Sequence, residues 1–192
     1  MKITMEGAEF NRIMRTCIPA LDKNGTRRVL EYIEIRCAGG VGAATGCDGF
    51  HLAQCCFAYE GDDCTFMLPK HRTVSNGSTI TISVKGDKIS ISDGEETVTR
   101  SLCKDVPPNW QKIVTGQEEK PQTATITVSA SRLRRILGSF DSNNDAVTFE
   151  IRGPLDGVVM RGPSIYGMLL PIRTNGQRHL ARFVKPGEES EK

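Results

Sequence analysis

The sequence has no long apolar run, no large excess of charge of one sign and few aromatic residues. Its 192 residues include 25 Lys and Arg against 23 Asp and Glu, which gives a formal net charge of +2, and aromatic residues make up 6%. The longest apolar stretches, such as residues 167–171, are far shorter than the roughly 20 residues of a membrane-spanning helix. The near-neutral charge gives no global sign of nucleic-acid binding, so any such surface must be local.

The first residues also lack the apolar core and cleavage site of a signal peptide. The seven cysteines are an odd number in a chain without an export signal, which favours reduced thiols and predicts a cytoplasmic protein. Five of them lie between residues 37 and 64, with His51 among them. A metal site, a catalytic thiol and small buried side chains are the three interpretations of this cluster.

The spacing of the cysteines argues against the first two interpretations. Zinc ligands usually come as C-x2–4-C pairs, whereas Cys55 and Cys56 are adjacent and point to opposite faces of a strand. Cys47 or Cys17 as a nucleophile has only His51 as a nearby base, with no identifiable orienting partner. Buried thiols are therefore preferred, and we expect no metal, no cofactor and no enzymatic activity; an enzyme using Cys47 and His51 is the least favoured alternative.

Two segments have the period of an amphipathic helix. In residues 8–21 the apolar residues fall at i, i+3, i+4, i+7, i+8 and i+11, and Pro19 is expected to break the last turn. In residues 129–140 the pattern i, i+3, i+4, i+7 follows Ser129, a typical N-cap residue. Strands are expected at residues 2–5, 32–36, 41–45, 51–59, 64–68, 78–84, 88–92, 96–102, 124–128, 146–151, 157–161 and 164–171.

The order of these elements repeats. Residues 1–60 and 123–173 both have the order β-α-β-β-β, while residues 64–115 contain strands without a helix, because the stretch between Pro69 and Ser78 is too short and polar. Residues 116–122 have the composition of a linker. The sequence therefore predicts an α+β fold of antiparallel sheets with helices on one face.

Four segments, in the same order, resemble segments of the bacterial DNA polymerase sliding clamps, the beta subunit of polymerase III. The four segments are ATGCDGFHLA at 44–53 (family ATDGHRLA), FMLPK at 66–70 (VIVPRK), DVPPNWQKIV at 105–114 (GRFPDYRRVLP) and MLLPIR at 168–173 (VMPMRL). Three departures concern single positions or one helix: His51 replaces an Arg, Cys47 is inserted before Asp48, and the helix after Pro69 is missing. The resemblance identifies a truncated or divergent member of the clamp family.

The resemblance implies a domain plan. Residues 1–115 resemble the middle domain of a clamp, 116–122 a linker and 123–173 the C-terminal half of the last domain. The first domain and the first half of the last domain have no counterpart. Residues 174–192 are expected to form a partly disordered tail, in which residues 177–183 have the Q-x-x-L-x-x-F spacing of a clamp-binding peptide.

The resemblance also implies a function, that of a DNA replication processivity factor. Polymerases or other replication proteins would insert a short peptide into an apolar pocket, and double-stranded DNA would be bound without sequence preference. The pocket residues carried over are Gly49, Phe50, His51, Leu52, Pro69, Leu170, Pro171 and Ile172. The DNA-facing residues carried over are Arg12, Arg15, Arg132, Arg134 and Arg135.

Two points stay open in the sequence. The chain is either such a tether or a clamp-fold interaction module, a decoy that captures clamp-binding peptides without encircling DNA. Three repeat units also leave the last one without a partner, which predicts a homo-oligomer, a dimer through residues 123–173 or a ring, with a compact monomer as the alternative.

Overall fold

The chain folds into two units, which are described separately below. The computed structural model describes residues 1–23, 25, 27–119, 121, 125–140, 146–162 and 165–172. Unit 1 comprises residues 1–114, and unit 2 begins at residue 115. The expected tail at 174–192, with its Q-x-x-L-x-x-F pattern, lies outside the described residues. None of the helices in the described ranges combines the length and the apolar content that crossing a bilayer requires.

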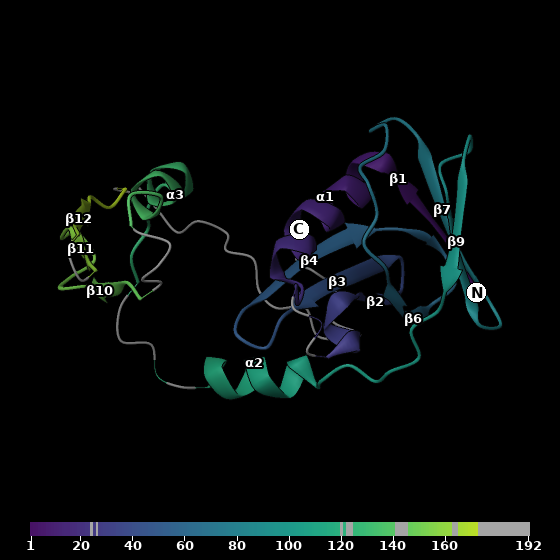
Figure 1. The fold of residues 1–192 in the computed structure, drawn as a ribbon, viewed down its shortest axis with the longest axis horizontal. Helices are drawn as coiled ribbons and strands as arrows, with labels where there is room; N and C mark the ends of the chain where they lie inside the picture. The colour runs from purple at the N-terminus through teal and green to yellow at the C-terminus, as the bar shows by residue number, and fades with distance from the viewer. Residues whose placement is uncertain are drawn as a thin grey trace. The chain divides into compact units, whose positions relative to one another are not determined.

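Unit 1 consists of two antiparallel sheets and the helix α1, which contacts strands of both sheets (Figure 1). The sheet orders are β5-β1-β7-β8-β9 and β4-β3-β2-β6. The elements are β1 (Lys2–Glu6), α1 (Gly7–Cys17), η1 (Ile18–Ala20), η2 (Arg28–Glu31), β2 (Ile33–Ala38), β3 (Val41–Cys47), β4 (Leu52–Ala58), β5 (Glu60–Gly61), β6 (Cys64–Leu68), β7 (Thr79–Lys85), β8 (Lys88–Ser92) and β9 (Thr97–Ser101).

The two halves of unit 1 exchange their first strands. β1 begins the first half but pairs with β7 of the second half, with Ile3 opposite Ile82. β6 begins the second half but pairs with β2 of the first half, with Phe66 opposite Ile35. Each sheet is therefore completed by a strand from the other half, and the two halves share one apolar core.

Helix α1 confirms the predicted periodicity. Its apolar face buries Phe10, Ile13, Met14 and Cys17 in the shared core, where each large side chain contributes roughly 1.5–3 kcal/mol. The helix ends at Cys17, and the chain continues as the short 3-10 turn η1 with Pro19 in its first turn. The expected break at Pro19 is thus confirmed, since proline cannot supply the N–H that a continuing α-helix needs.

The segment between β6 and β7 contains no helix, as predicted, and the buried side chain of Asn11 holds it in place. Asn11 Nδ2 donates to the Val74 carbonyl at 2.8 Å, and its Oδ1 accepts from the Val74 N–H at 2.9 Å. Asn11 Nδ2 is also 2.8 Å from Oδ1 of Asn76. One amide thus satisfies a backbone donor and a backbone acceptor that a helix would have paired internally.

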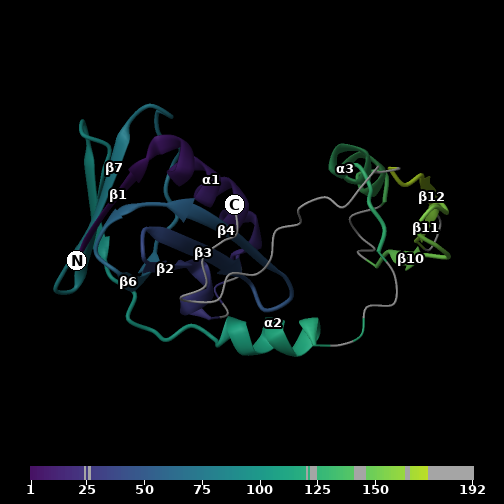
Figure 2. The same ribbon diagram turned by 180° about the vertical axis from the view of Figure 1, so that it is seen from behind.

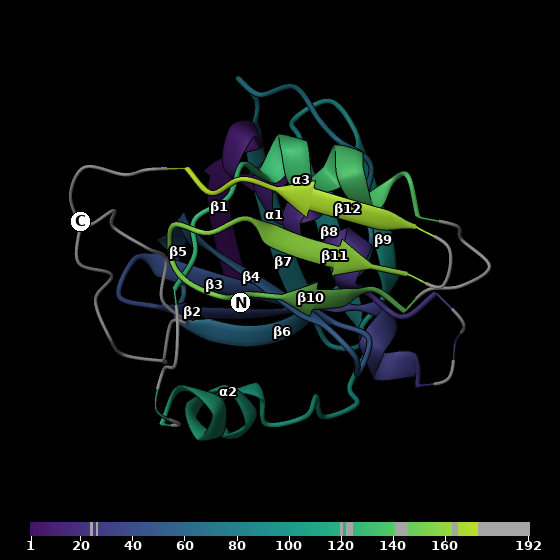
Figure 3. The ribbon, with the colours of Figure 1, turned by 90° about the vertical axis from the view of Figure 1, so that its left-hand side faces the viewer.

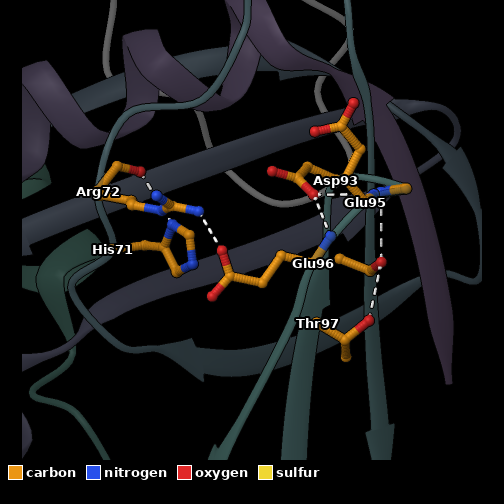
Figure 4. A network of polar contacts seen from close by, with 8 residues as sticks. His71, Arg72, Asp93, Glu95, Glu96 and Thr97 are labelled. Carbon is orange, nitrogen blue, oxygen red and sulfur yellow. Dashed lines mark hydrogen bonds and ion pairs between the residues drawn. The ribbon is translucent and has the colours of Figure 1, made fainter.

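A polar network ties the same segment to the turn between β8 and β9 (Figure 4). Arg72 forms an ion pair with Glu96, and Asp93 Oδ1 accepts from the backbone N–H groups of Glu95 and Glu96 at 3.1 and 2.8 Å. These two bonds, led by that of Glu96, lower the pKa of Asp93. The segment therefore covers its sheet by side-chain bonds instead of helix packing.

The chain after β9 differs from the prediction, because it contains the helix α2 (Trp110–Glu118), which begins in unit 1 and ends in unit 2 (Figure 2). Asn109 Oδ1 accepts from the N–H of Lys112 at 3.1 Å, in the manner of an N-cap. The expectation of no helix in residues 64–115 is wrong here, and the expected linker at 116–122 begins inside α2. The helix was not predicted because its apolar residues show only weak helical periodicity. The Pro-Pro-Asn sequence at 107–109, with Asn109 as a possible N-cap, was the feature that could have indicated the start of a helix.

Unit 2 contains a helix packed on a three-stranded sheet of order β10-β11-β12 (Figure 3). Its N-cap is confirmed, since Ser129 Oγ accepts from the N–H of Arg132. Gly167 on the sheet allows close approach, because an added Cβ would come within 2.9 Å of Ile136. The elements are α3 (Ala130–Leu137), β10 (Thr148–Glu150), β11 (Val158–Arg161) and β12 (Tyr166–Leu169).

The described part of the predicted strand at 124–128, residues 125–128, is not part of this sheet. The Thr127 carbonyl accepts from the Ile172 N–H at 2.7 Å. The other predicted strands of unit 2 are confirmed with shorter bounds.

Replacing Asn11 by Ala should destabilise unit 1 by about 2–3 kcal/mol, because it leaves a backbone donor and acceptor of Val74 without partners. Urea unfolding followed by circular dichroism measures this change. The matched control is Asn76→Ala, which removes only the bond between the two side chains and should cost less than about 1 kcal/mol. Equal losses for the two variants would contradict the assigned role of Asn11.

Candidate functional site

The turn between β3 and β4 holds three of the predicted pocket residues, Gly49, Phe50 and His51, in a fixed backbone conformation, and Leu52 follows as the first residue of β4. Asp48 Oδ1 accepts from the N–H groups of Phe50 and His51 at 2.9 and 3.0 Å, and Asp48 Oδ2 is 3.0 Å from His51 Nδ1. The bonds from His51 and Phe50 lower the pKa of Asp48. Gly49 has a φ of +97°, which a glycine adopts without strain. His51 Nε2 lies 3.3 Å from the carbonyl of Pro19.

The turn presents Phe50 outward, whereas Leu52, the first residue of β4, points inward. Phe50 is 98% exposed, although it is a large aromatic residue. Leu52 is half-buried and packs on a small cluster formed by Leu30, Cys47 and Trp110. The indole N–H of Trp110 has no hydrogen-bond partner among the described residues. Trp110 and Leu30 were not among the predicted site residues, although Trp110 lies in one of the four resembling segments.

Pro69 lies at the same end of the sheet as this turn. Glu34 on β2 pairs with Thr45 on β3 and with Met67 on β6, so these residues form one row across the sheet. The 48–51 turn and Pro69 both follow that row within a few residues, and Pro69 is buried. The strand exchange that inserts β6 therefore brings Pro69 to the end of the sheet that carries Phe50.

The remaining predicted pocket residues belong to unit 2, where they follow β12. Leu170 is 62% exposed, and Pro171 and Ile172 are half-buried. The Ile172 N–H donates to Thr127, which holds this end of the segment against the chain that leads into α3. Unit 2 thus presents a second short apolar stretch on a backbone that is fixed at one end.

The predicted DNA-facing arginines lie on α1 and α3 and differ in their partners. Arg12 pairs with Glu9 and donates to the Cys56 carbonyl, and Arg15 Nε donates to the Asn11 carbonyl at 3.2 Å. The three arginines of α3 are exposed and form no ion pair with any residue that the structure describes; they are Arg132, Arg134 and Arg135. The stronger local positive field is therefore that of α3.

The cysteines serve as small core side chains. All seven are free thiols, and Cys17, Cys37, Cys47 and Cys103 are buried. Burial raises the pKa of Cys47, and His51 faces Asp48 and Pro19 instead of a thiol. Cys55 is the exception, because a hydrogen bond from Cys17 lowers its pKa to about 7. Among the described residues, no three His, Cys, Asp or Glu side chains gather as metal ligands.

Known structures resemble this chain, although no protein-family model matches it and no curated protein matches it in sequence. The Bacillus subtilis DNA polymerase sliding clamp has a TM-score of 0.72 at 13% identity, over 92% of this chain and 50% of that one. The Pseudomonas aeruginosa clamp has 0.73 at 15%, over 92% and 52%. The Thermotoga maritima DNA polymerase III beta subunit has 0.70 at 18%, over 89% and 50%.

These similarities show the fold. The chain has the α+β fold of the bacterial sliding clamps, as the resemblance of its four segments predicted, and it spans about half the length of the clamps that it matches. Solved clamps thus share the arrangement of sheets and helices that carries the 48–51 turn.

Replacing Asp48 by Ala should lower the melting temperature at pH 7, because the turn loses its two backbone bonds. The folded-state pKa of Asp48 lies below its ordinary value of 3.8, so the ionised carboxylate stabilises the fold above that pH. This stabilisation disappears as the pH falls through the folded-state pKa. The difference between wild type and variant should therefore shrink below about pH 4.

Thermal unfolding across pH 7 to 3 measures this difference, with the exposed Asp87→Ala as matched control. A melting-temperature difference that stays constant over this range would rule out the carboxylate as its source.

Proposed function

We propose that this protein is a sliding-clamp-like processivity factor, a non-enzymatic tether that holds polymerase-type partners by a short linear peptide. The observation that carries the proposal is the ordered 48–51 turn, which exposes Phe50 on a clamp fold beside the apolar cluster under Leu52. The solved relatives support the choice of class, since they are DNA polymerase sliding clamps.

The physical basis of the peptide site is the exposed aromatic ring on a rigid support. A fully exposed Phe loses hydration when a partner covers it, and a backbone already fixed by Asp48 loses little entropy on binding. Leu52 and Trp110 form an apolar floor behind the turn. A peptide with two or three apolar anchors suits such a surface.

The physical basis of DNA association is the charge of α3. Arg132, Arg134 and Arg135 are exposed within one short helix that has no acidic residue in its first turn. Arginines of this kind attract phosphates through long-range, salt-sensitive interactions and do not read bases. We therefore propose sequence-independent contact with double-stranded DNA at this helix.

Replacing Phe50 by Ala should weaken binding of a fluorescent peptide with the Q-x-x-L-x-x-F spacing by about tenfold or more, because aromatic anchors dominate such interfaces. Fluorescence anisotropy measures the change, and Leu52→Ala should weaken binding as well. The matched control is Val106→Ala, an 87% exposed apolar residue of unit 1 outside the site, which should bind like wild type. No detectable binding by the wild-type protein would refute the peptide site.

Replacing Arg132, Arg134 and Arg135 together by Gln should reduce the salt dependence of DNA binding. If each contacts one phosphate, the slope of log K against log salt should fall by about 2–3, and random-sequence duplexes should be affected alike. The control is the double variant Arg152→Gln and Arg161→Gln, whose arginines already pair with Glu150.

Retention on circular but not linearised DNA distinguishes the tether from the decoy. A protein that binds the peptide yet is retained on neither form would act only as a peptide-capturing module.

A further inference from the structure

Two cysteine thiols lie together where the end of α1 contacts β3 and β4 in unit 1 (Figure 1). Cys17 Sγ, at the last residue of α1, lies 3.5 Å from the Ala44 carbonyl oxygen and 4.0 Å from that of Ala53. Ala44 is directly opposite Cys55 in the β3–β4 ladder, and Ala53 precedes Cys55 by two residues on β4. The Cys17 thiol therefore lies at the level of Cys55 in the sheet, and the two thiols share a hydrogen bond.

A glycine in β3 allows the end of α1 to come this close to the sheet. A Cβ added to Gly46 would lie 2.6 Å from the backbone carbonyl oxygen of Cys17, which leaves no room for any other residue at position 46. The separation of the two thiols is thus set by the packing of the helix on the sheet and not by a mobile loop.

The two thiols differ in exposure and in proton affinity. Cys17 is 0% exposed, whereas Cys55 is partly exposed. The hydrogen bond from Cys17 lowers the pKa of Cys55 to about 7, against the effect of burial. Thr16 and Arg12, on the same helix, act in the same direction as Cys17, whereas Glu9 opposes them. The hydrogen bond to Cys55, together with burial, raises the pKa of Cys17, so the buried member of the pair keeps its proton.

Four other cysteines have a different environment. Cys37 and Cys64 face each other across β2 and β6, but burial raises the pKa of both thiols. Burial also raises the pKa of Cys47 and of Cys56, the neighbour of Cys55 on β4. An accessible thiolate beside a second thiol is the arrangement that favours reversible oxidation, and the pair formed by Cys17 and Cys55 has it.

We propose that Cys55 and Cys17 form a reversible redox pair that reacts with hydroperoxides, with Cys55 as the attacking thiolate and Cys17 as the resolving thiol. The Cys55 thiolate attacks the terminal peroxide oxygen, the O–O bond breaks, and the leaving alkoxide or hydroxide takes a proton from solvent. Cys55 is then a sulfenic acid.

The second step converts the sulfenic acid into a disulfide. The Cys17 sulfur attacks the Cys55 sulfur, the S–S bond forms and the S–O bond breaks, and the departing hydroxide takes the Cys17 proton and leaves as water. The two thiols lose two electrons in total, which reduce the hydroperoxide to an alcohol or water. A low-molecular-weight thiol restores both cysteines by thiol–disulfide exchange.

The disulfide would join two segments that meet beside the 48–51 turn. Cys17 is followed by η1 with Pro19, whose carbonyl lies 3.3 Å from His51 Nε2, and Cys55 belongs to β4, which begins directly after the turn. Oxidation would therefore link α1 covalently to β4 next to this contact. The inference does not rest on the proposed peptide site or on DNA, because the thiol chemistry requires neither.

The test treats the reduced full-length protein, without peptide or DNA, with a small excess of hydrogen peroxide or cumene hydroperoxide at pH 7. Mass spectrometry of the unreduced digest should find residues 17 and 55 in one disulfide-linked species, and dithiothreitol should reverse the link. The protein should lose two of its seven thiols. Before oxidation, iodoacetamide should label Cys55 at least about tenfold faster than Cys56.

Substitutions separate the two steps. Cys17→Ser keeps a donor near the Ala44 carbonyl but cannot form a disulfide, so Cys55 should stop at the sulfenic acid, which dimedone traps. Cys55→Ser should abolish both products. The matched control is Cys56→Ser, on the same strand, which should form the wild-type disulfide at the wild-type rate. Circular dichroism checks the folding of each variant, and the digest of the wild-type protein decides where a variant does not fold.

A disulfide between Cys17 and Cys55 that forms in wild type and in Cys56→Ser is the expected result. Survival of all seven thiols in the peroxide-treated wild-type protein would overturn the proposal. Formation of another disulfide in its place, such as one between Cys37 and Cys64, would overturn it as well.

Discussion

The exchange of first strands within unit 1 is the constraint on which the rest of the structure depends. β1 completes the sheet of the second half and β6 completes that of the first, so neither half can bury its apolar face without the other. The core around Phe10 and Ile35 is shared as a result. The same exchange brings Pro69 to the end of the sheet that carries the 48–51 turn. Fold and candidate site thus follow from one pairing scheme.

The strand exchange is maintained although the segment between β6 and β7 contains no helix. The side chain of Asn11 on α1 forms two hydrogen bonds with the backbone of Val74, in place of the backbone bonds of a helix. The Arg72–Glu96 ion pair fixes the segment between β6 and β7 to the turn between β8 and β9. The Glu96 carboxylate also compensates the positive charge of Arg72 at the surface. The positive charge available to a polyanion is therefore concentrated on α3, where three arginines lack acidic partners among the described residues.

Local patterns in the sequence predicted α1, α3 and nearly all strands, because period and capping depend on neighbouring residues. Asp48 and Gly49 likewise mark the turn that positions Phe50. The strand exchange was not predictable in this way, since β1 and β7 lie more than 70 residues apart and their pairing depends on the whole core. Trp110 was missed for the same reason, because it joins Leu30 and Cys47 only in the folded chain. Helix α2 was missed because its apolar residues are few and its cap went unrecognised.

The predicted strand at 124–128 is the most informative difference between the sequence-based prediction and the structure. Its alternation of Thr and aliphatic residues favours a strand, yet its described part contributes to no ladder. In unit 1 the equivalent strand finds its partner within the same chain, so the pairing is intramolecular and independent of concentration. In unit 2, α3 packs on a three-stranded sheet that is smaller than either sheet of unit 1, so the placement of its three arginines depends on a smaller structural support than the one that holds α1.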